Sequence, residues 1–299
     1  MKEYSTSVTA NLCTFARAYH SNFVRNKVFD DYLSYDLMGK DLYEKTGLLI
    51  QNKFLKEDFG CNENLCTASI IPELVEFIEP IPISRIVFFE SELHGFADRF
   101  GNIQYVICGA GLDSFGFRNA DKRIRVFEID HPNTQEFKKE RIRNLEWNSK
   151  ELNFVPVDFS KDDMNASLLK NGFDPKVPAF FAIPGVSYYL TLPVLEETVR
   201  KIQNLCEAPA LVCLDFPDDT TFKRRDDDRV TVLAKITERL SEKMTGTYSV
   251  SEMQDMFSRH GFMIEKHFDP QRIQESFFAG RSDGLRAFEN VHFMTAKNF

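Results

Sequence analysis

Three apolar segments of the chain each end in residues that could bind an adenosine. The first segment, residues 104–108, runs directly into Gly109-Ala110-Gly111-Leu112-Asp113. Glycines after a strand allow a tight turn and a close approach of the backbone to a ligand. The dinucleotide-binding spacing G-x-G-x-x-G would need a third glycine at position 114, which is Ser114. By itself the loop is also compatible with a plain tight turn.

A carboxylate closes the second segment, residues 125–129. Asp130 follows Gly111 by 19 positions, and an acid in that place can accept hydrogen bonds from both hydroxyls of a ribose. Glu128 is the rival for this role, because it lies two residues earlier and on the same face of the strand. The alternative role for Asp130 is to cap the helix expected to begin near Pro132.

The third segment, residues 153–157, is followed by Asp158 and Phe159. The carboxylate can accept from the exocyclic amine of an adenine, and the ring can pack on the base. Alone, this pair is equally typical of a helix cap. Ligands of open α/β sheets bind outside the carboxyl ends of the strands. Three consecutive strand ends with such groups therefore predict an adenosine-binding edge.

An α/β sheet must position these groups. Five apolar runs, 104–108, 125–129, 153–157, 179–183 and 210–214, alternate with amphipathic stretches at 134–145, 164–171 and 193–206. Runs that are apolar through most of their length, and do not alternate, indicate parallel strands covered on both faces. The tail predicts a helix over 251–260, a strand over 262–268, a helix over 271–278 and a last strand over 291–296.

We expect a single domain, residues 1–299, made of two regions. Residues 1–100 predict a helical extension, with one helix opening near Pro72 and another over 84–99. Residues 101–299 predict the sheet-bearing core. Within the core, the polar stretch 217–249 is too long for an ordinary connection. It predicts an insertion, with a helix over 230–243, that forms a lid over an acceptor pocket.

Composition and charge exclude several classes of protein. The net charge is −8, with 45 acidic and 37 basic residues, which argues against a nucleic-acid partner. No stretch approaches the roughly 18 apolar residues of a membrane span, and the first residues lack a signal-peptide core. We therefore expect a cytoplasmic protein. The histidines show no metal-binding spacing, so no metal site is expected.

Four stretches of the chain resemble a known family, the S-adenosylmethionine-dependent leucine carboxyl methyltransferases. They are GAGLDSFGFR (109–118), VFEIDHPNTQEFKKERI (126–142), FVPVDF (154–159) and GVSYYL (185–190). The similarity is greater to the bacterial branch linked to O-methylation in polyketide pathways. The resemblance implies S-adenosyl-L-methionine as cofactor. It also implies the class I methyltransferase fold, a Rossmann-like sheet of seven strands, mostly parallel, whose last strand is antiparallel.

The resemblance also assigns residues to the cofactor. Arg85 matches the arginine that pairs with the methionine carboxylate of the cofactor. The cofactor-binding set that it implies is Arg85, Gly109, Ala110, Gly111, Asp130, Asp158, Phe159 and Gly185. One departure is Pro184, because many members of the family have a glutamate there that helps hold the amino group of the cofactor. Backbone carbonyls near Gly109 and Ala182 could substitute for it.

These observations favour an O-methyltransferase that acts on a carboxylate or a hydroxyl of a small molecule. Tyr188, Tyr189 and His131 are the candidates to line the acceptor site, and no catalytic base is identified. Pro184 motivates a second hypothesis, a catalytically weak or inactive cofactor-binding protein on the same fold. A third, a nucleotide-cofactor oxidoreductase, is disfavoured because position 114 is not a glycine.

Overall fold

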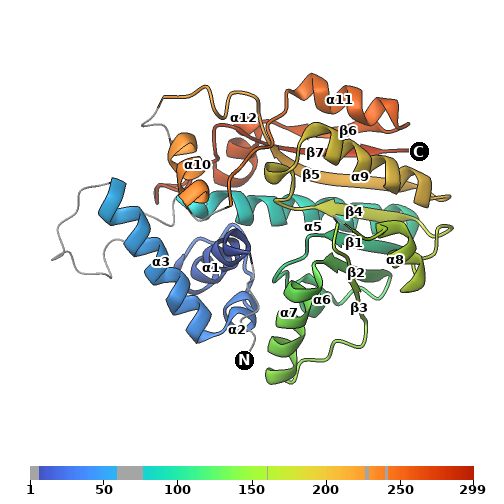
Figure 1. Cartoon of the computed structure of the whole chain (residues 1–299), viewed down its shortest axis with the longest axis horizontal. Coiled ribbons are helices and arrows are strands. Elements are labelled where there is room, and N and C mark those ends of the chain that lie inside the picture. The colour runs from blue at the N-terminus through green and yellow to red at the C-terminus, as the bar shows by residue number, and fades with distance from the viewer. Residues whose placement is uncertain (1–6, 59–76, 160, 226–228, 240–241) are drawn as a thin grey trace.

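Seven strands form one sheet at the centre of the molecule (Figure 1). The computed structural model describes residues 7–58, 77–159, 161–225, 229–239 and 242–299, so the helix predicted to open near Pro72 lies outside the described residues. The strands are β1 (Ile103–Cys108), β2 (Ile124–Asp130), β3 (Leu152–Pro156), β4 (Ala179–Ile183), β5 (Ala210–Pro217), β6 (Met263–Phe268) and β7 (Val291–Lys297).

The strand order is β3-β2-β1-β4-β5-β7-β6. Strands β1 to β5 pair in parallel, and β7 lies antiparallel to both of its neighbours, β5 and β6. The predicted mostly parallel sheet with an antiparallel last strand is therefore confirmed. The chain order reverses between β1 and β4, and that reversal opens a crevice at the carboxyl ends of the strands.

Helices cover both faces of the sheet, which explains why the strands read as continuous apolar runs. One set of alternate side chains, including Tyr105 and Phe180, packs against α5 (Pro80–Phe100). The other set, including Val106 and Phe181, packs against α8 (Met164–Lys170), α9 (Leu192–Leu205) and α11 (Val250–Arg259). Helix α5 begins a turn earlier than predicted, because Pro80 suits the first turn of a helix.

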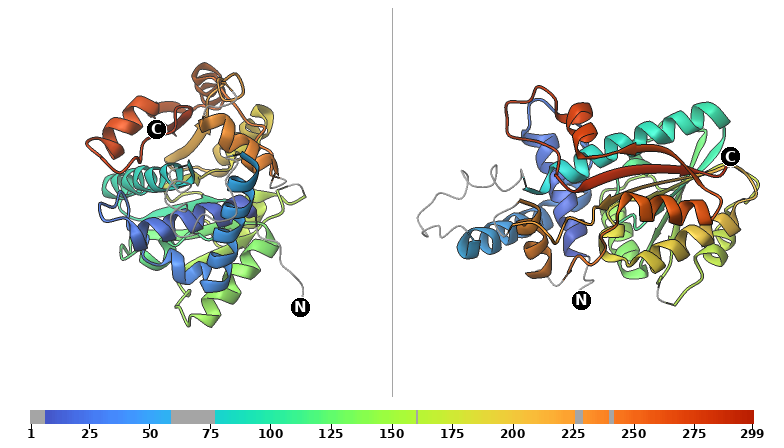
Figure 2. Two further views of the ribbon diagram at one scale, coloured as in Figure 1. Left: turned by 90° about the vertical axis from the view of Figure 1, so that its left-hand side faces the viewer. Right: turned by 90° about the horizontal axis from the view of Figure 1, so that it is seen from above.

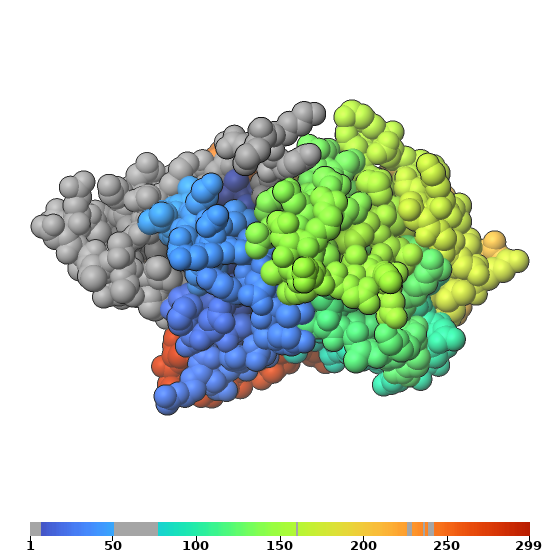
Figure 3. All heavy atoms as spheres, turned by 90° about the horizontal axis from the view of Figure 1, so that it is seen from below, coloured from blue at the N-terminus to red at the C-terminus, as the bar shows by residue number. Residues whose placement is uncertain are grey.

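The N-terminal helices pack against one end of this layered core (Figure 2). They are α1 (Val8–Phe23), α2 (Ser34–Met38) and α3 (Lys40–Asp58). Helix α2 contacts α7 (Pro132–Asn144), and Figure 3 shows the blue and green surfaces of these regions side by side. Arg141 of α7 donates hydrogen bonds to the carbonyls of Leu37 (3.2 Å) and Asp36 (3.1 Å). The predicted helical extension is therefore docked on the core.

Short helices complete the chain. They are α6 (Phe115–Arg118), the 3-10 turn η2 (Ser187–Tyr189), α10 (Arg229–Arg239), α12 (Pro270–Ile273) and the π-helical turn η3 (Gln274–Phe278). Helix α10 lies in the predicted insertion and places Leu233 in the same core as α5. Among the described residues, no helix is both long and apolar enough to cross a bilayer.

Two substitutions on α9 test how this helix is held. Ile202 is fully buried against the sheet, so Ile202→Ala leaves a cavity and should lower the free energy of unfolding by about 2–5 kcal/mol. Val194 lies on the same helix but is 50% exposed, so Val194→Ala should change it by less than about 0.5 kcal/mol. Chemical denaturation measures both values, and similar losses would contradict the assigned inner face of α9.

Candidate cofactor and acceptor site

A cavity of about 290 Å³ lies at the carboxyl ends of β1, β2 and β4. Its walls come from one face of α1, from α5, from the glycine loop after β1, from the start of α7 and from the turn after β4. It brings together seven of the residues that the sequence nominated: Arg85, Gly109, Ala110, Gly111, Asp130, Gly185 and Tyr189. These residues are far apart in the chain, so the strand order alone makes them neighbours.

The glycine loop has the geometry that its residues suggest. Gly109 has φ +78°, and a Cβ there would lie 2.7 Å from Cγ2 of Val186, so a larger residue would be strained and crowded. The backbone N–H of Gly111 donates to Oδ2 of Asp130 over 2.6 Å. The loop after β1 is thereby tied to the end of β2.

Asp130, and not Glu128, faces the cavity. The two oxygens of Asp130 accept from the backbone N–H groups of Gly111 and His131, both over 2.6 Å. Burial raises the pKa of Asp130 above its ordinary value, and these hydrogen bonds oppose the shift. A carboxylate accepts up to about four hydrogen bonds, so acceptor positions remain for the hydroxyls of a ribose.

Glu128 has a different partner. Its Oε2 accepts from Nζ of Lys138 over 2.6 Å, and each side chain is only 1% exposed. Burial raises the pKa of Glu128 to about 7, and Lys138 opposes that shift. Glu128 does not line the cavity. The pair instead fixes α7 against β2, which removes Glu128 as the rival for the ribose.

Three nominated residues, His131, Asp158 and Phe159, do not line the cavity. Nδ1 of His131 accepts from the backbone of Asn133 over 3.2 Å, so His131 caps α7. The cap considered for Asp130 therefore belongs to the next residue, and the geometry does not place His131 at an acceptor. Asp158 pairs with Lys161 over 2.6 Å, and Phe159 is 50% exposed. The N–H of Val157 donates to the carbonyl of Asp130. Asp158 and Phe159 follow directly and therefore lie beside Asp130. Their contact with an adenine remains a prediction.

One acid beside Arg85 was missed by the sequence analysis. Asp215 lies in β5, and its Oδ2 accepts from Nη1 of Arg85 over 2.9 Å. Its Oδ1 accepts from the backbone N–H of Gly185 over 2.7 Å. The signal was available in the sequence, since an acid interrupts the apolar pattern of the fifth strand. Pro184 lines the cavity and brings no charge, and of the two carbonyl sources only Gly109 lies in its wall.

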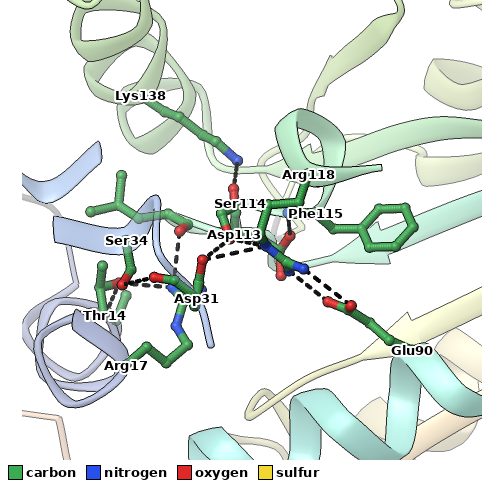
Figure 4. Close-up of polar contacts among 12 residues, drawn as sticks. Thr14, Arg17, Asp31, Ser34, Glu90, Asp113, Ser114, Phe115, Arg118 and Lys138 are labelled. Carbon is green, nitrogen blue, oxygen red and sulfur yellow. Dashed lines mark hydrogen bonds and ion pairs between the residues drawn. The ribbon is translucent and has the colours of Figure 1, made fainter. Parts of the chain in front are cut away.

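Helix α1 supplies a second set of residues that the sequence analysis missed. Its Arg17 pairs with Asp31 over 2.5 Å (Figure 4). Arg17 also donates to the carbonyl of Leu112 over 2.9 Å. Ser114 also donates to Asp31 over 2.5 Å. Nearby, Arg118 binds both carboxylate oxygens of Glu90 of α5, and it too lies beside Asp31. Nothing in the sequence indicated these contacts, because the residues that pair lie on different elements.

A second, smaller cavity of about 70 Å³ shares a wall with the first. Its walls come from α1, α5, η2 and α10, and it includes Tyr188 and Tyr189. Burial raises the pKa of both tyrosines, and the Asp215 carboxylate adds to the shift at Tyr188. Both therefore stay protonated at neutral pH. Arg85, Cys13 and Tyr189 line both cavities, so a molecule in the second cavity lies next to one in the first.

The seven-stranded sheet, with its glycine loop after β1 and its cavity at the carboxyl ends of the strands, is that of the class I methyltransferases that use S-adenosylmethionine. A candidate methyltransferase from Thermobifida fusca has the same fold. It aligns with 99% of this chain and 96% of its own, with a TM-score of 0.57 at 13% identity.

The chain belongs to the leucine carboxyl methyltransferase family, whose family model matches residues 10–203. A Bacillus subtilis protein, YktD, named as a candidate S-adenosyl-L-methionine-dependent methyltransferase, is 32% identical, and the alignment covers 99% of both chains. A Rhodococcus jostii protein with a similar description is 32% identical over 51% of this chain and 52% of its own. The expected family, enzyme class and cofactor are confirmed, and the oxidoreductase alternative loses its basis.

Asp130→Asn should weaken binding of S-adenosylhomocysteine by about 10- to 150-fold, because a hydrogen bond to a charged group contributes roughly 1.5–3 kcal/mol. Asparagine offers one carbonyl oxygen and a mismatched donor. Calorimetry measures the affinity, and thermal melting checks the fold.

Glu128→Gln is the matched control, since it removes a neighbouring carboxylate that does not line the cavity. It should lower the melting temperature and leave the affinity for S-adenosylhomocysteine nearly unchanged. A larger loss of affinity for Glu128→Gln than for Asp130→Asn would mean that the wrong carboxylate has been assigned to the ribose.

Proposed function

We propose that the protein is an O-methyltransferase that esterifies the carboxylate of a small molecule bound in the second cavity. S-adenosylmethionine, when bound, supplies a methyl group already activated by the positive charge on sulfur. The protein then has to position an acceptor oxygen and exclude water. Arg85, Gly109, Gly111 and Asp130 are the residues that would hold the cofactor.

The absence of a base from the second cavity carries the preference for a carboxylate. Among its described lining residues there is no histidine, aspartate, glutamate or lysine, and the raised pKa values of Tyr188 and Tyr189 keep both protonated. A hydroxyl acceptor needs its proton removed. A carboxylic acid, with a pKa of about 4, is already ionised at neutral pH.

The acids of the first cavity do not replace that base. Glu90 is bound at both oxygens by Arg118, and Asp113 accepts from the backbone of Phe115 over 2.7 Å. Asp130 is held by Gly111. Glu90 is thus paired with a guanidinium, and Asp130 is the acid proposed to bind the ribose, which supports an acceptor that arrives ionised.

The walls of the second cavity support a small, largely apolar acceptor. Apolar side chains make up nearly half of its lining residues, among them Leu12, Ile81, Leu233 and Met244. Arg85 is the one cation among the described lining residues. Leu233, Thr237 and Met244 come from the stretch 217–249, and this placement supports our proposal that the stretch acts as a lid. A volume of about 70 Å³ favours a small molecule over a protein segment.

A second candidate function is cofactor binding without transfer. Pro184 is the observation that motivates it, because the cavity wall carries no charge at that position. The two candidates differ in turnover and not in binding.

A panel of small apolar carboxylic acids and their matched alcohols tests the proposal. We expect methyl esters and S-adenosylhomocysteine, measured by mass spectrometry, from the acids alone. The rate should be nearly constant between about pH 6 and 9, because the acceptor is ionised throughout that range. Turnover of alcohols alone, at a rate that climbs with pH, would contradict the proposal. Cofactor binding without any product would favour the second candidate.

Leu233→Trp tests which cavity holds the acceptor. Leu233 lines the second cavity and not the first, so a larger ring should exclude the acceptor while leaving the cofactor cavity intact. Overfilling a packed site costs about 1–3 kcal/mol, so kcat/KM for the acceptor should fall by roughly 5- to 150-fold. The Kd of S-adenosylhomocysteine should stay within about twofold of its original value. Unchanged turnover in a folded variant would place the acceptor elsewhere.

A further inference from the structure

Asp215 is a buried acid in a strand that is otherwise apolar. Side chains alternate along β5, so Leu211, Cys213 and Asp215 share the face that α5 covers. The side chain of Asp215 is 0% exposed. A buried carboxylate is costly unless it is paired and fully hydrogen-bonded, so its contacts are expected to be specific.

Those contacts join three elements beside the site. Oδ2 accepts from Nη1 of Arg85 on α5 over 2.9 Å, and Oδ1 accepts from the N–H of Gly185 after β4 over 2.7 Å. The backbone carbonyl of Asp215 accepts from the hydroxyl of Ser187 in η2 over 2.5 Å. Asp215 thereby holds the guanidinium of Arg85, the turn after β4 and the start of η2, which carries Tyr188 and Tyr189.

The guanidinium of Arg85 lies directly against this turn. Gly185 has φ +69°, and a Cβ there would lie 2.6 Å from Nη1 of Arg85. The missing side chain therefore makes room for the guanidinium. The Asp215 contact uses Nη1, and a guanidinium carries five N–H donors in a fixed fork, so fixing one side orients the others.

The strand order places Arg85 far from the ribose acid. Asp130 ends β2, Asp215 lies in β5, and β1 and β4 lie between them. With strands about 4.8 Å apart, the two acids are separated by roughly 14 Å across the sheet. A ligand whose ribose contacts Asp130 reaches Arg85 only with the part that extends away from its adenosine.

We propose that Asp215 is a positioning residue for the amino-acid end of the cofactor. Its carboxylate fixes the guanidinium of Arg85 and the amide of Gly185 before the cofactor binds. It acts through these two groups and does not line the cavity itself. The inference concerns cofactor binding alone, so it does not depend on the identity of the acceptor.

Two ligands separate this role from a structural one. S-adenosylhomocysteine has the amino-acid end, whereas 5′-methylthioadenosine keeps the adenosine and the thioether but lacks the amino and carboxylate groups. Asp215→Asn keeps the shape but places an N–H donor against either Arg85 or the N–H of Gly185. By calorimetry it should weaken binding of S-adenosylhomocysteine by roughly 10- to 100-fold and change that of 5′-methylthioadenosine by less than about twofold.

The matched control is Glu128→Gln, which removes another buried, paired carboxylate. It should lower the melting temperature without discriminating between the two ligands. Equal weakening of both ligands by Asp215→Asn would reduce Asp215 to a structural role. Unchanged or tighter binding of S-adenosylhomocysteine would overturn the proposal as well, and a rise only in the KM of the acceptor would assign Arg85 to the acceptor instead.

Gly185→Ala gives the same test if Asp215→Asn does not fold. Its new methyl group displaces the guanidinium of Arg85 while the Asp215 carboxylate stays in place. The same selective loss of S-adenosylhomocysteine is expected. Unchanged affinity for S-adenosylhomocysteine, or equal loss of both ligands, would contradict the positioning role.

Discussion

The buried ion pair between Arg17 and Asp31 connects the N-terminal helices to the glycine loop after β1. Arg17 also donates to the carbonyl of Leu112, and Ser114 donates to Asp31, so both ends of the pair hold the segment after β1. Breaking a buried pair by removing one partner costs about 3–5 kcal/mol, because a charge is left uncompensated. Helix α1 is therefore part of the wall of the site, although it precedes the sheet by eighty residues.

Charge compensation recurs around the cavity. Arg85 pairs with Asp215, Arg118 with Glu90 and Lys138 with Glu128, and each pair joins two different elements. Paired groups lose little freedom when a ligand arrives, because their orientation is already fixed. Preorganised donors of this kind suit a reaction in which the protein contributes position and electrostatics more than proton transfer. The two adjoining cavities fit that requirement, since Arg85 and Tyr189 lie in both walls.

Much of the fold could be predicted because its strands are buried on both faces. A strand of that kind is apolar at most positions, so the predicted runs 104–108, 179–183 and 210–214 each lie within or match an observed strand. Where the hydrophobic pattern was weaker, the predicted helix boundaries differ from those of the structure. Residues 242 and 243, which were expected to be helical, are not, and the helix expected over 271–278 divides into α12 and a π-helical turn. These boundaries depend on packing against other elements and not on local preference.

The sequence by itself determined the alternation of strands and helices, the glycine loop and the carboxylate at the end of the second strand. These features are local, because a run of apolar residues, a G-x-G turn and an acid at a strand end each follow from neighbours in the chain. Only the tertiary structure decided that Glu128 pairs with Lys138, that His131 caps a helix, that Asp215 pairs with Arg85 and that Arg17 lies in the cavity wall. The physical reason is that burial and pairing depend on how the elements pack. Arg17 and Leu112 are 95 positions apart and Arg85 and Asp215 are 130 apart, and only the packed helices and sheet bring such groups together.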